Sequence, residues 1–284
     1  MKLLRVGEVG SEKPAILDSD NNIRDLSNYV GDIDGSTINS AGLKLIEDIK
    51  LEELPVVSSD VRIGPCIGSV GKYVCIGLNY SDHAEEANMP IPSEPIIFFK
   101  APSCISGPYD AIVLPKGAEK VDWEVELCVV IGSEAKYVSE QEAMNFVAGF
   151  CVANDVSERH FQLERGGQWV KGKSSDSFGP IGPWLVTKDE VKDCQNLSLY
   201  LEVDGRRYQD GSTSTMIFNV PHIVSYVSHF MSLQPGDIIA TGTPPGVGMG
   251  QDPQTYLKEG QVVSASVEGL GTQRQLVVPW EAPK

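Results

Sequence analysis

The sequence predicts a β-rich α+β fold behind a small N-terminal domain. Two observations lead to this class. From residue 72 onward the chain consists mainly of short apolar segments bounded by Gly, Pro or Asp, which is typical of strands. Helical periodicity is restricted to a few short stretches, and no internal repeat is visible. At 284 residues, the chain is long enough for one small and one large domain.

The small domain is predicted to comprise residues 1–70, connector included. KLLRVGEV and KPAILDSDNNIRDL each indicate short strands around the polar turn at Asp18–Asn22. A helix is expected over Ser40–Leu54. Pro55, Gly64, Pro65 and Gly68 then mark a connector.

Residues 71–284 are predicted to form a metal-dependent catalytic domain. The Asp204–Gly205 pair is a strong signal for a two-residue hairpin. Helices are expected at Glu140–Val147 and Val220–Met231. The expected strands are KYVCIGL, EPIIFFK, AIVLP, VDWEVELCVVIG, LSLYLEVDGRRYQDG, DIIATGT and VVSASVEGLG.

Composition and charge argue against several kinds of partner and location. The formal net charge is −16 and no Lys/Arg-rich run exists, so nucleic acid is not expected as a partner. The longest apolar run is too short for a membrane span, and the N-terminus does not resemble a signal peptide. The six cysteines show no C-x-x-C pair and lie in apolar stretches, which favours reduced core thiols in a cytoplasmic protein, with zinc binding the lesser alternative.

The stretch GQWVKGKS, residues 167–174, matches the phosphate-loop pattern letter for letter. A phosphate loop requires a buried strand before it and a helix after it. Here the preceding SERHFQLERG is polar and helix-like, and the following SDSFGPIGPW is broken by glycines and prolines. ATP binding is therefore not expected, and Lys173 needs another explanation.

Three carboxylates suggest a metal site. In a strand covering residues 121–132, Glu124 and Glu126 would share one face. The alternative is an edge strand whose acidic face lies in water. Asp155, which follows the apolar strand GFCVAN, could complete an all-oxygen set suited to Mg²⁺, Mn²⁺ or Ca²⁺. Its alternative role is a helix N-cap.

His83 and Glu86 are i and i+3 in a short helix expected from Ser81 to about residue 88. A carboxylate beside an imidazole orients it and favours its protonated form, which suits a general base. An incidental pair on an exposed helix surface is the alternative. The other histidines (His160, His222 and His229) show no such pattern.

Taken together, these segments resemble the fumarylacetoacetate hydrolase family over residues 75 to about 250, and residues 1–70 resemble the extra N-terminal domain of many bacterial members. The segments that carry the resemblance, in family order, are GLNYSDHAEE, IIFFKAPS, VDWEVELCVVIG, NDVSERHFQ, KGKSSDSFGPIGPW, DGSTSTMIFNVPHIVSYVS and LQPGDIIATGTPPGVG. The resemblance implies a mixed β-sheet roll.

The resemblance also implies roles for individual residues. The metal, Mg²⁺ or Mn²⁺ with Ca²⁺ able to substitute in vitro, would be held by Glu124, Glu126 and Asp155. The pair that activates water would be His83 and Glu86. Lys173 and Gln162 would stabilise the oxyanion, and the substrate-binding residues would be Thr243 and Arg159.

Glu158 and His160 depart from the usual family pattern N-D-x-[ST]-A-R-D-x-Q. With RGGQWVKGKS, they resemble the bacterial branch that acts on 2,4-diketo-3-deoxy sugar acids derived from L-rhamnonate or L-fuconate, often labelled ureidoglycolate lyase. The expected reaction is hydrolysis of the C3–C4 bond of a 2,4-dioxo acid to pyruvate and a hydroxy acid. Oxaloacetate decarboxylation, ureidoglycolate cleavage or mere dicarboxylate binding are the alternatives. A homodimer is usual in the family.

Overall fold

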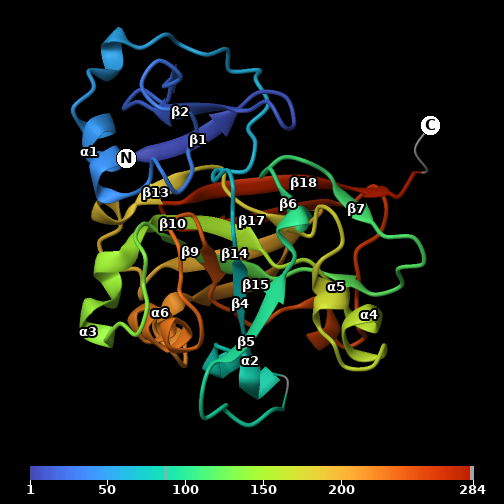
Figure 1. The fold of residues 1–284 in the computed structure, drawn as a ribbon. Helices are drawn as coiled ribbons and strands as arrows, with labels where there is room; N and C mark the ends of the chain where they lie inside the picture. The colour runs from blue at the N-terminus through green and yellow to red at the C-terminus, as the bar shows by residue number, and fades with distance from the viewer. Residues whose placement is uncertain (87, 282–284) are drawn as a thin grey trace.

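The computed structural model describes residues 1–86 and 88–281 and confirms the β-rich α+β class. Its largest element is a nine-stranded mixed sheet (Figure 1). In spatial order the strands are β3 (Ile23–Asp25), β2 (Lys13–Leu17), β1 (Lys2–Val6), β13 (Leu185–Thr187), β10 (Val147–Asn154), β9 (Val125–Ile131), β16 (Ile238–Ala240), β4 (Tyr73–Gly77) and β5 (Ile96–Lys100). Among the described residues, β16–β4 is the only parallel pair within this sheet.

A second sheet packs against the middle of the first. Its strands, in order, are β15 (Arg206–Ser212), β14 (Ser198–Val203), β17 (Val262–Val267), β18 (Gly271–Pro279) and β7 (Ile112–Leu114). Strands β9 and β10 lie against β14, β17 and β18, and the side chains between the sheets form the main core. Every residue of β9 and β10 is buried, so polar side chains on these strands must be paired or bind a ligand.

The β14–β15 hairpin confirms the turn expected at Asp204–Gly205. Both residues have positive φ, 52° and 77°, and Val203 faces Arg206 across the turn. This backbone matches a type I′ turn, whose twist suits the flanking strands. Two short pairs complete the strands: β11 (Ser157–Glu158) with β8 (Val121–Asp122), and β12 (Gly179–Pro180) with β6 (Ile105–Ser106).

The helices are short. They are α1 (Ser40–Glu47), α2 (Ser81–Glu86), α3 (Glu140–Ala143), α4 (Arg159–Leu163), α5 (Val170–Lys173) and α6 (Val220–Phe230). The 3₁₀ turns are η1 (Leu51–Glu53), η2 (Pro102–Cys104), η3 (Met144–Phe146), η4 (Lys188–Glu190), η5 (Thr213–Thr215) and η6 (Gly248–Gly250). No described helix has the length and apolar character needed to cross a membrane.

Three expected helices are shorter in the structure. The helix predicted over residues 40–54 ends at Glu47 and is followed by the separate turn η1. The helix predicted over residues 140–147 becomes 3₁₀ at Met144, and Val147 already begins β10. Helix α2 ends at Glu86; Ala87, which the predicted helix included, lies outside the described residues.

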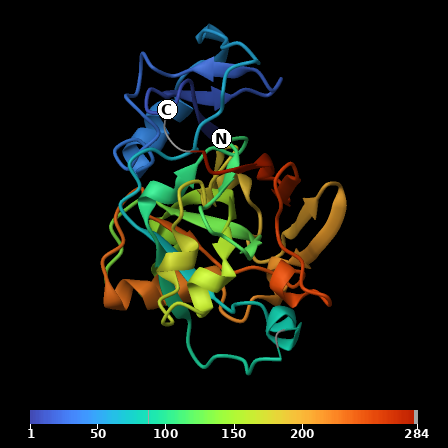
Figure 2. The ribbon, with the colours of Figure 1, turned by 90° about the vertical axis from the view of Figure 1, so that its right-hand side faces the viewer.

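The N-terminal strands extend the large sheet. Strand β1 pairs with β13, with Lys2 opposite Val186 and Leu3 opposite Leu185. Leu3 and Ile16 belong to the same buried cluster as the central strands. The 1–70 unit lies at one end of the molecule and α2 at the opposite end (Figures 1 and 2). The division into domains at residue 70 stays a prediction.

Candidate metal centre and catalytic cavity

The three predicted metal ligands lie together at the ends of the two central strands. Glu126 is in β9, Glu124 lies in the gap between β8 and β9, and Asp155 follows β10. The Asp155 N–H donates to the Glu124 carbonyl at 2.8 Å, and the Asn154 side chain accepts from the Glu124 N–H at 3.0 Å. One carboxylate oxygen from each of the three residues lies within 4.8 Å of the others. This spacing allows all three to ligate one ion.

The alternatives considered for these residues are wrong. The segment 121–132 is not an edge strand with an acidic face in water, because β9 is buried on both faces at the centre of the sheet. The segment is also not one continuous strand, since Trp123 and Glu124 separate β8 from β9. Asp155 does not cap a helix. The N-cap of α4 is Glu158, whose carboxylate accepts from the Phe161 N–H. The Glu158 carboxylate also accepts from the backbone N–H groups of Glu119 and Lys120. Glu158, which departs from the usual family pattern, therefore has a structural role.

Three buried cations surround the triad. Lys173 donates to Glu124 and to Asp155, both at 2.7 Å, and Lys100 pairs with the other oxygen of Asp155. Arg159 pairs with Glu124 at 2.7 Å. Burial by itself would raise the pKa of Glu124, but Lys173 and Arg159 outweigh it and lower the pKa to about 2.

Glu126 lacks such compensation. Its carboxylate accepts from the Gly242 N–H at 2.8 Å, and no lysine or arginine among the described residues forms an ion pair with it. Burial, followed by repulsion from Asp155 and Glu124, raises its pKa well above the ordinary value. A buried carboxylate without a counter-ion, beside two carboxylates that are paired with cations, fits a divalent cation, and the all-oxygen donor set fits Mg²⁺ or Mn²⁺. The residues present therefore fit the expected metal.

The His83–Glu86 pair has the geometry that the sequence predicts. His83 Nδ1 lies 3.0 Å from Glu86 Oε2, and the His83 side chain is only 14% exposed, so the pair does not lie on an open surface. Glu86 also accepts from the Gly246 N–H at 2.9 and 3.1 Å, which joins α2 to the loop after β16. With Nδ1–H donated to Glu86, the Nε2 lone pair of His83 is available to accept a proton.

The stretch 167–174 lacks the flanks of a phosphate loop. It is preceded by helix α4 and includes α5, and the chain after it continues into the short strand β12. Lys173 is buried between two carboxylates. Burial lowers its pKa, but Asp155 and Glu124 outweigh this and raise it, so the side chain is an ammonium at neutral pH.

The remaining predicted residues, Arg159, Thr243 and Gln162, also line the cavity, and all three have protein partners. Arg159 is paired with Asp122 and Glu124 at 2.8 and 2.7 Å. The Thr243 hydroxyl donates to the Val125 carbonyl at 2.8 Å, so it must release this bond before it can donate to a substrate carboxylate. Gln162 accepts from Arg159 at 3.1 Å, which leaves its NH₂ group as a donor. The substrate-binding roles of Arg159 and Thr243 stay predictions.

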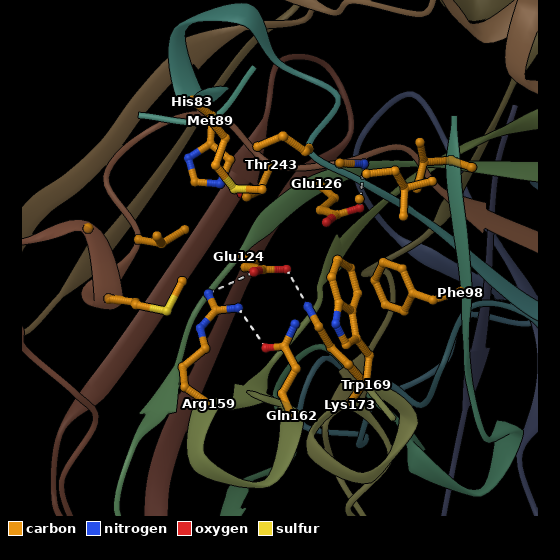
Figure 3. Close-up of a pocket in the computed structure, with 18 of the residues that line it drawn as sticks. His83, Met89, Phe98, Glu124, Glu126, Arg159, Gln162, Trp169, Lys173 and Thr243 are labelled. Atoms are coloured by element: carbon orange, nitrogen blue, oxygen red, sulfur yellow. Dashed lines mark hydrogen bonds and ion pairs between the residues drawn. The ribbon is translucent and has the colours of Figure 1, made fainter. Parts of the chain in front are cut away.

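All the site residues predicted from the sequence, except Asp155, line one cavity of about 500 Å³ (Figure 3). The carboxylates and cations occupy one part of it, His83 and Met89 lie together on another side, and Trp169 packs beside Phe98. A volume of this size accommodates a small organic acid. The cavity thus holds a candidate metal site, a candidate base and an ammonium.

Sequence reasoning missed two charged residues of the site. Lys100 is fully buried, pairs with Asp155 and donates to the Val156 carbonyl at 3.0 Å. Asp122 is also buried; it pairs with Arg159 and accepts from the Gly248 and Met249 N–H groups at 2.6 and 2.9 Å. The signal for Lys100 is a lysine that ends the apolar strand IIFFK, but nothing in the sequence identifies its partner.

Known proteins resemble this chain over nearly its whole length. Residues 72–278 match the family model described as fumarylacetoacetate (FAA) hydrolase C-terminal. A Burkholderia multivorans protein with the provisional name of hydrolase is 59% identical, over 97% of this chain and 98% of its own. The structure of fumarylacetoacetate hydrolase from Exiguobacterium antarcticum is 33% identical with a TM-score of 0.89, covering 99% of this chain and all of that one.

A further solved structure contains ligands. Maleylpyruvate hydrolase from Sphingobium sp. SYK-6, in complex with manganese(II) and pyruvate, is 26% identical with a TM-score of 0.83, again over 99% of this chain and all of that one. The similar structures include isomerases as well as hydrolases.

Proposed function

Since the chain belongs to the fumarylacetoacetate hydrolase family, we propose that it is a metal-dependent hydrolase of 2,4-dioxo acids. Water would cleave the C3–C4 bond, so that C4 leaves as a carboxylic acid and C3 becomes the methyl carbon of pyruvate. The observation that carries this proposal is one cavity that contains both the cation-free Glu126 in a carboxylate triad and the His83–Glu86 pair. Manganese and pyruvate in a related hydrolase support it.

The residues of the site have different roles in the proposed hydrolysis. When bound, a divalent ion at the triad supplies a Lewis acid for the 2-oxo acid end of the substrate. His83, oriented by Glu86, takes a proton from the attacking water at Nε2. The Lys173 ammonium and the Gln162 NH₂ group donate toward the oxygen that becomes negative at C4. Glu124 and Glu126 act as ligands, not as acids or bases.

The substrate we propose is a 2,4-diketo-3-deoxy sugar acid, such as the L-rhamnonate or L-fuconate derivative, which would yield pyruvate and a hydroxy acid. The resemblance of the 154–174 segment to that branch supports this choice. The same triad could serve oxaloacetate decarboxylation or ureidoglycolate cleavage. Decarboxylation consumes no activated water, so the His83–Glu86 pair at the cavity favours hydrolysis.

The test is direct. Pyruvate release from acetylpyruvate, from the sugar acid and from oxaloacetate is followed with lactate dehydrogenase, and glyoxylate release from ureidoglycolate is measured separately. We expect the 2,4-dioxo acids to be turned over with the highest kcat/KM. Preference for oxaloacetate or ureidoglycolate would replace the proposed function with that alternative.

We also propose that the active species is a cytoplasmic homodimer with no nucleic-acid or membrane partner. A homodimer is usual in the family, which supports the oligomeric state, and the formal net charge of −16 supports the absence of a nucleic-acid partner. Analytical ultracentrifugation at micromolar concentration tests the dimer, and a single monomeric species would contradict it.

A further inference from the structure

The cavity has two chemically different parts. Its polar part is lined by Glu124, Glu126, Arg159 and Lys173, and His83 lies on another side, next to Met89. Most of the remaining wall is apolar, formed by Met89, Ile96, Phe98, Leu163, Trp169 and Met249. The rings of Phe98 and Trp169 pack edge to face with centroids 5.3 Å apart, which makes this part of the wall rigid (Figure 3).

The cations that line the cavity are already committed. Among the described residues, its only lysine and arginine are Lys173 and Arg159, and each forms ion pairs with two carboxylates. Two further cations, Arg165 and Lys171, line a separate surface hollow with Phe161. Among the described residues, the apolar wall itself contributes no cation; the Lys173 ammonium lies 4.9 Å from the Phe98 ring centroid but is already paired with two carboxylates.

The charge balance of the site leads to the same conclusion. Apart from His83, the site contains five carboxylates and three buried cations. The carboxylates are those of Glu86, Asp122, Glu124, Glu126 and Asp155, and the cations are Lys100, Arg159 and Lys173. A divalent ion brings the sum to zero. One substrate carboxylate can then bind at the polar part, but a second one would lie against aromatic and aliphatic side chains without a counter-ion.

From this arrangement, and resting on the proposed function, we infer that the acyl tail of the substrate is uncharged and ends in an apolar group. The chain then discriminates against dicarboxylates, the class to which fumarylacetoacetate and maleylpyruvate belong. Derivatives of L-rhamnonate and L-fuconate meet this requirement because 6-deoxy sugars end in a methyl group. Sugar acids that end in a hydroxymethyl or carboxylate group fit the apolar wall less well.

A matched pair of substrates tests the inference. Butanoylpyruvate and succinylpyruvate have the same seven-carbon skeleton and differ only in a terminal methyl or carboxylate. In the Mn²⁺-loaded enzyme, we expect kcat/KM to be about 10–100-fold higher for butanoylpyruvate, the scale of a like-charge or unpaired-charge penalty. Equal values, or a preference for succinylpyruvate, would overturn the inference while leaving the proposed hydrolysis intact.

A binding experiment decides the inference independently of turnover. 2-Oxohexanoate and 2-oxoadipate form an equivalent pair that cannot be hydrolysed, and calorimetry with the Mn²⁺-loaded protein should give the lower Kd for 2-oxohexanoate. Tighter binding of 2-oxoadipate would contradict the inference. If neither seven-carbon substrate releases pyruvate but 2-oxohexanoate binds preferentially, the proposed function fails and the tail preference stands.

A pair of variants locates the preference. Leu163→Arg places a cation on the apolar wall, whereas Val170→Arg adds the same charge on neighbouring α5, outside the residues that line the cavity; the two side chains are 46% and 40% exposed. We expect Leu163→Arg to raise the succinylpyruvate to butanoylpyruvate ratio of kcat/KM at least about tenfold and Val170→Arg to leave it unchanged. An equal response in both variants would show long-range attraction and not a property of the wall.

Discussion

Replacing His83 with alanine removes the proposed general base while leaving the metal ligands in place. His83 lines the cavity from α2, its Nδ1 is 3.0 Å from Glu86, and Glu86 is tied to the Gly246 N–H. Loss of a positioned general base costs about 10²–10⁴-fold in kcat, which corresponds to about 3–5 kcal/mol of transition-state stabilisation. The Kd of the substrate should change little because its carboxylate end binds at the other part of the cavity.

The assay compares three proteins and two substrates. Wild type, His83→Ala and Glu86→Gln are assayed with acetylpyruvate and with oxaloacetate, and the metal content of each preparation is measured. Glu86→Gln should have an intermediate kcat because its side chain can still hydrogen-bond to the imidazole but no longer stabilises the protonated ring. Any oxaloacetate decarboxylation should persist in His83→Ala, since that reaction needs no activated water.

Two results would refute this reasoning. Normal acetylpyruvate hydrolysis by His83→Ala would mean that α2 is only part of the cavity wall. Equal loss of both activities with the metal retained would mean that His83 positions substrate or protonates the enolate, and the water-activating role would have to be withdrawn.

Further predictions concern the charged groups. The raised pKa of Glu126 means that its carboxyl competes for protons, so metal affinity should increase as pH rises; calorimetry in buffers of different ionisation enthalpy should detect proton release in wild type and none in Glu126→Gln. Lys100→Met breaks a buried ion pair and should cost the metal-free protein about 3–5 kcal/mol in urea unfolding, against under about 1 kcal/mol for Lys50→Met at an exposed pair; equal losses would contradict this. A titration with Mg·ATP should show no binding at millimolar ligand, where about 4 kcal/mol would be visible; saturable binding lost in Lys173→Ala would contradict it.

The sign of the stability change at Glu126 follows from the same shift. A carboxyl whose pKa is raised on folding stabilises the folded state below its unfolded pKa, and that contribution is lost as pH rises through the folded pKa. The metal-free protein should therefore become less stable toward alkaline pH, and bound Mn²⁺ should remove most of this dependence. A Tm of the metal-free protein that stays constant from pH 5 to 8 would contradict the assignment.

Local patterns in the sequence identified most of the candidate site. Glu124 and Glu126 were predicted from their alternate positions in an apolar strand, and Asp155 from its place directly after another apolar strand. The i, i+3 spacing of His83 and Glu86 placed them on one helix face. These features depend on residues close together in the chain. That the His83–Glu86 pair and the carboxylate triad lie at the same cavity could not be derived from periodicity.

Long-range pairing is what the sequence could not provide. Lys100 lies 55 positions from Asp155, and Asp122 lies 37 from Arg159, so no local pattern indicates either ion pair. The same applies to the pairing of β1 with β13, which joins the N-terminal strands to the central sheet. Alternation correctly placed Glu124 and Glu126 together, but it did not indicate that β9 is buried on both faces.

The most direct test of the central claim is pyruvate release from acetylpyruvate by the same preparation before and after exhaustive chelation, and again after addition of Mn²⁺, with metal content determined by elemental analysis. The carboxylate triad predicts that activity disappears with the metal, returns with about one Mn²⁺ per chain, and does not return in Glu126→Gln. Full pyruvate release by a protein shown to contain no metal would contradict the account.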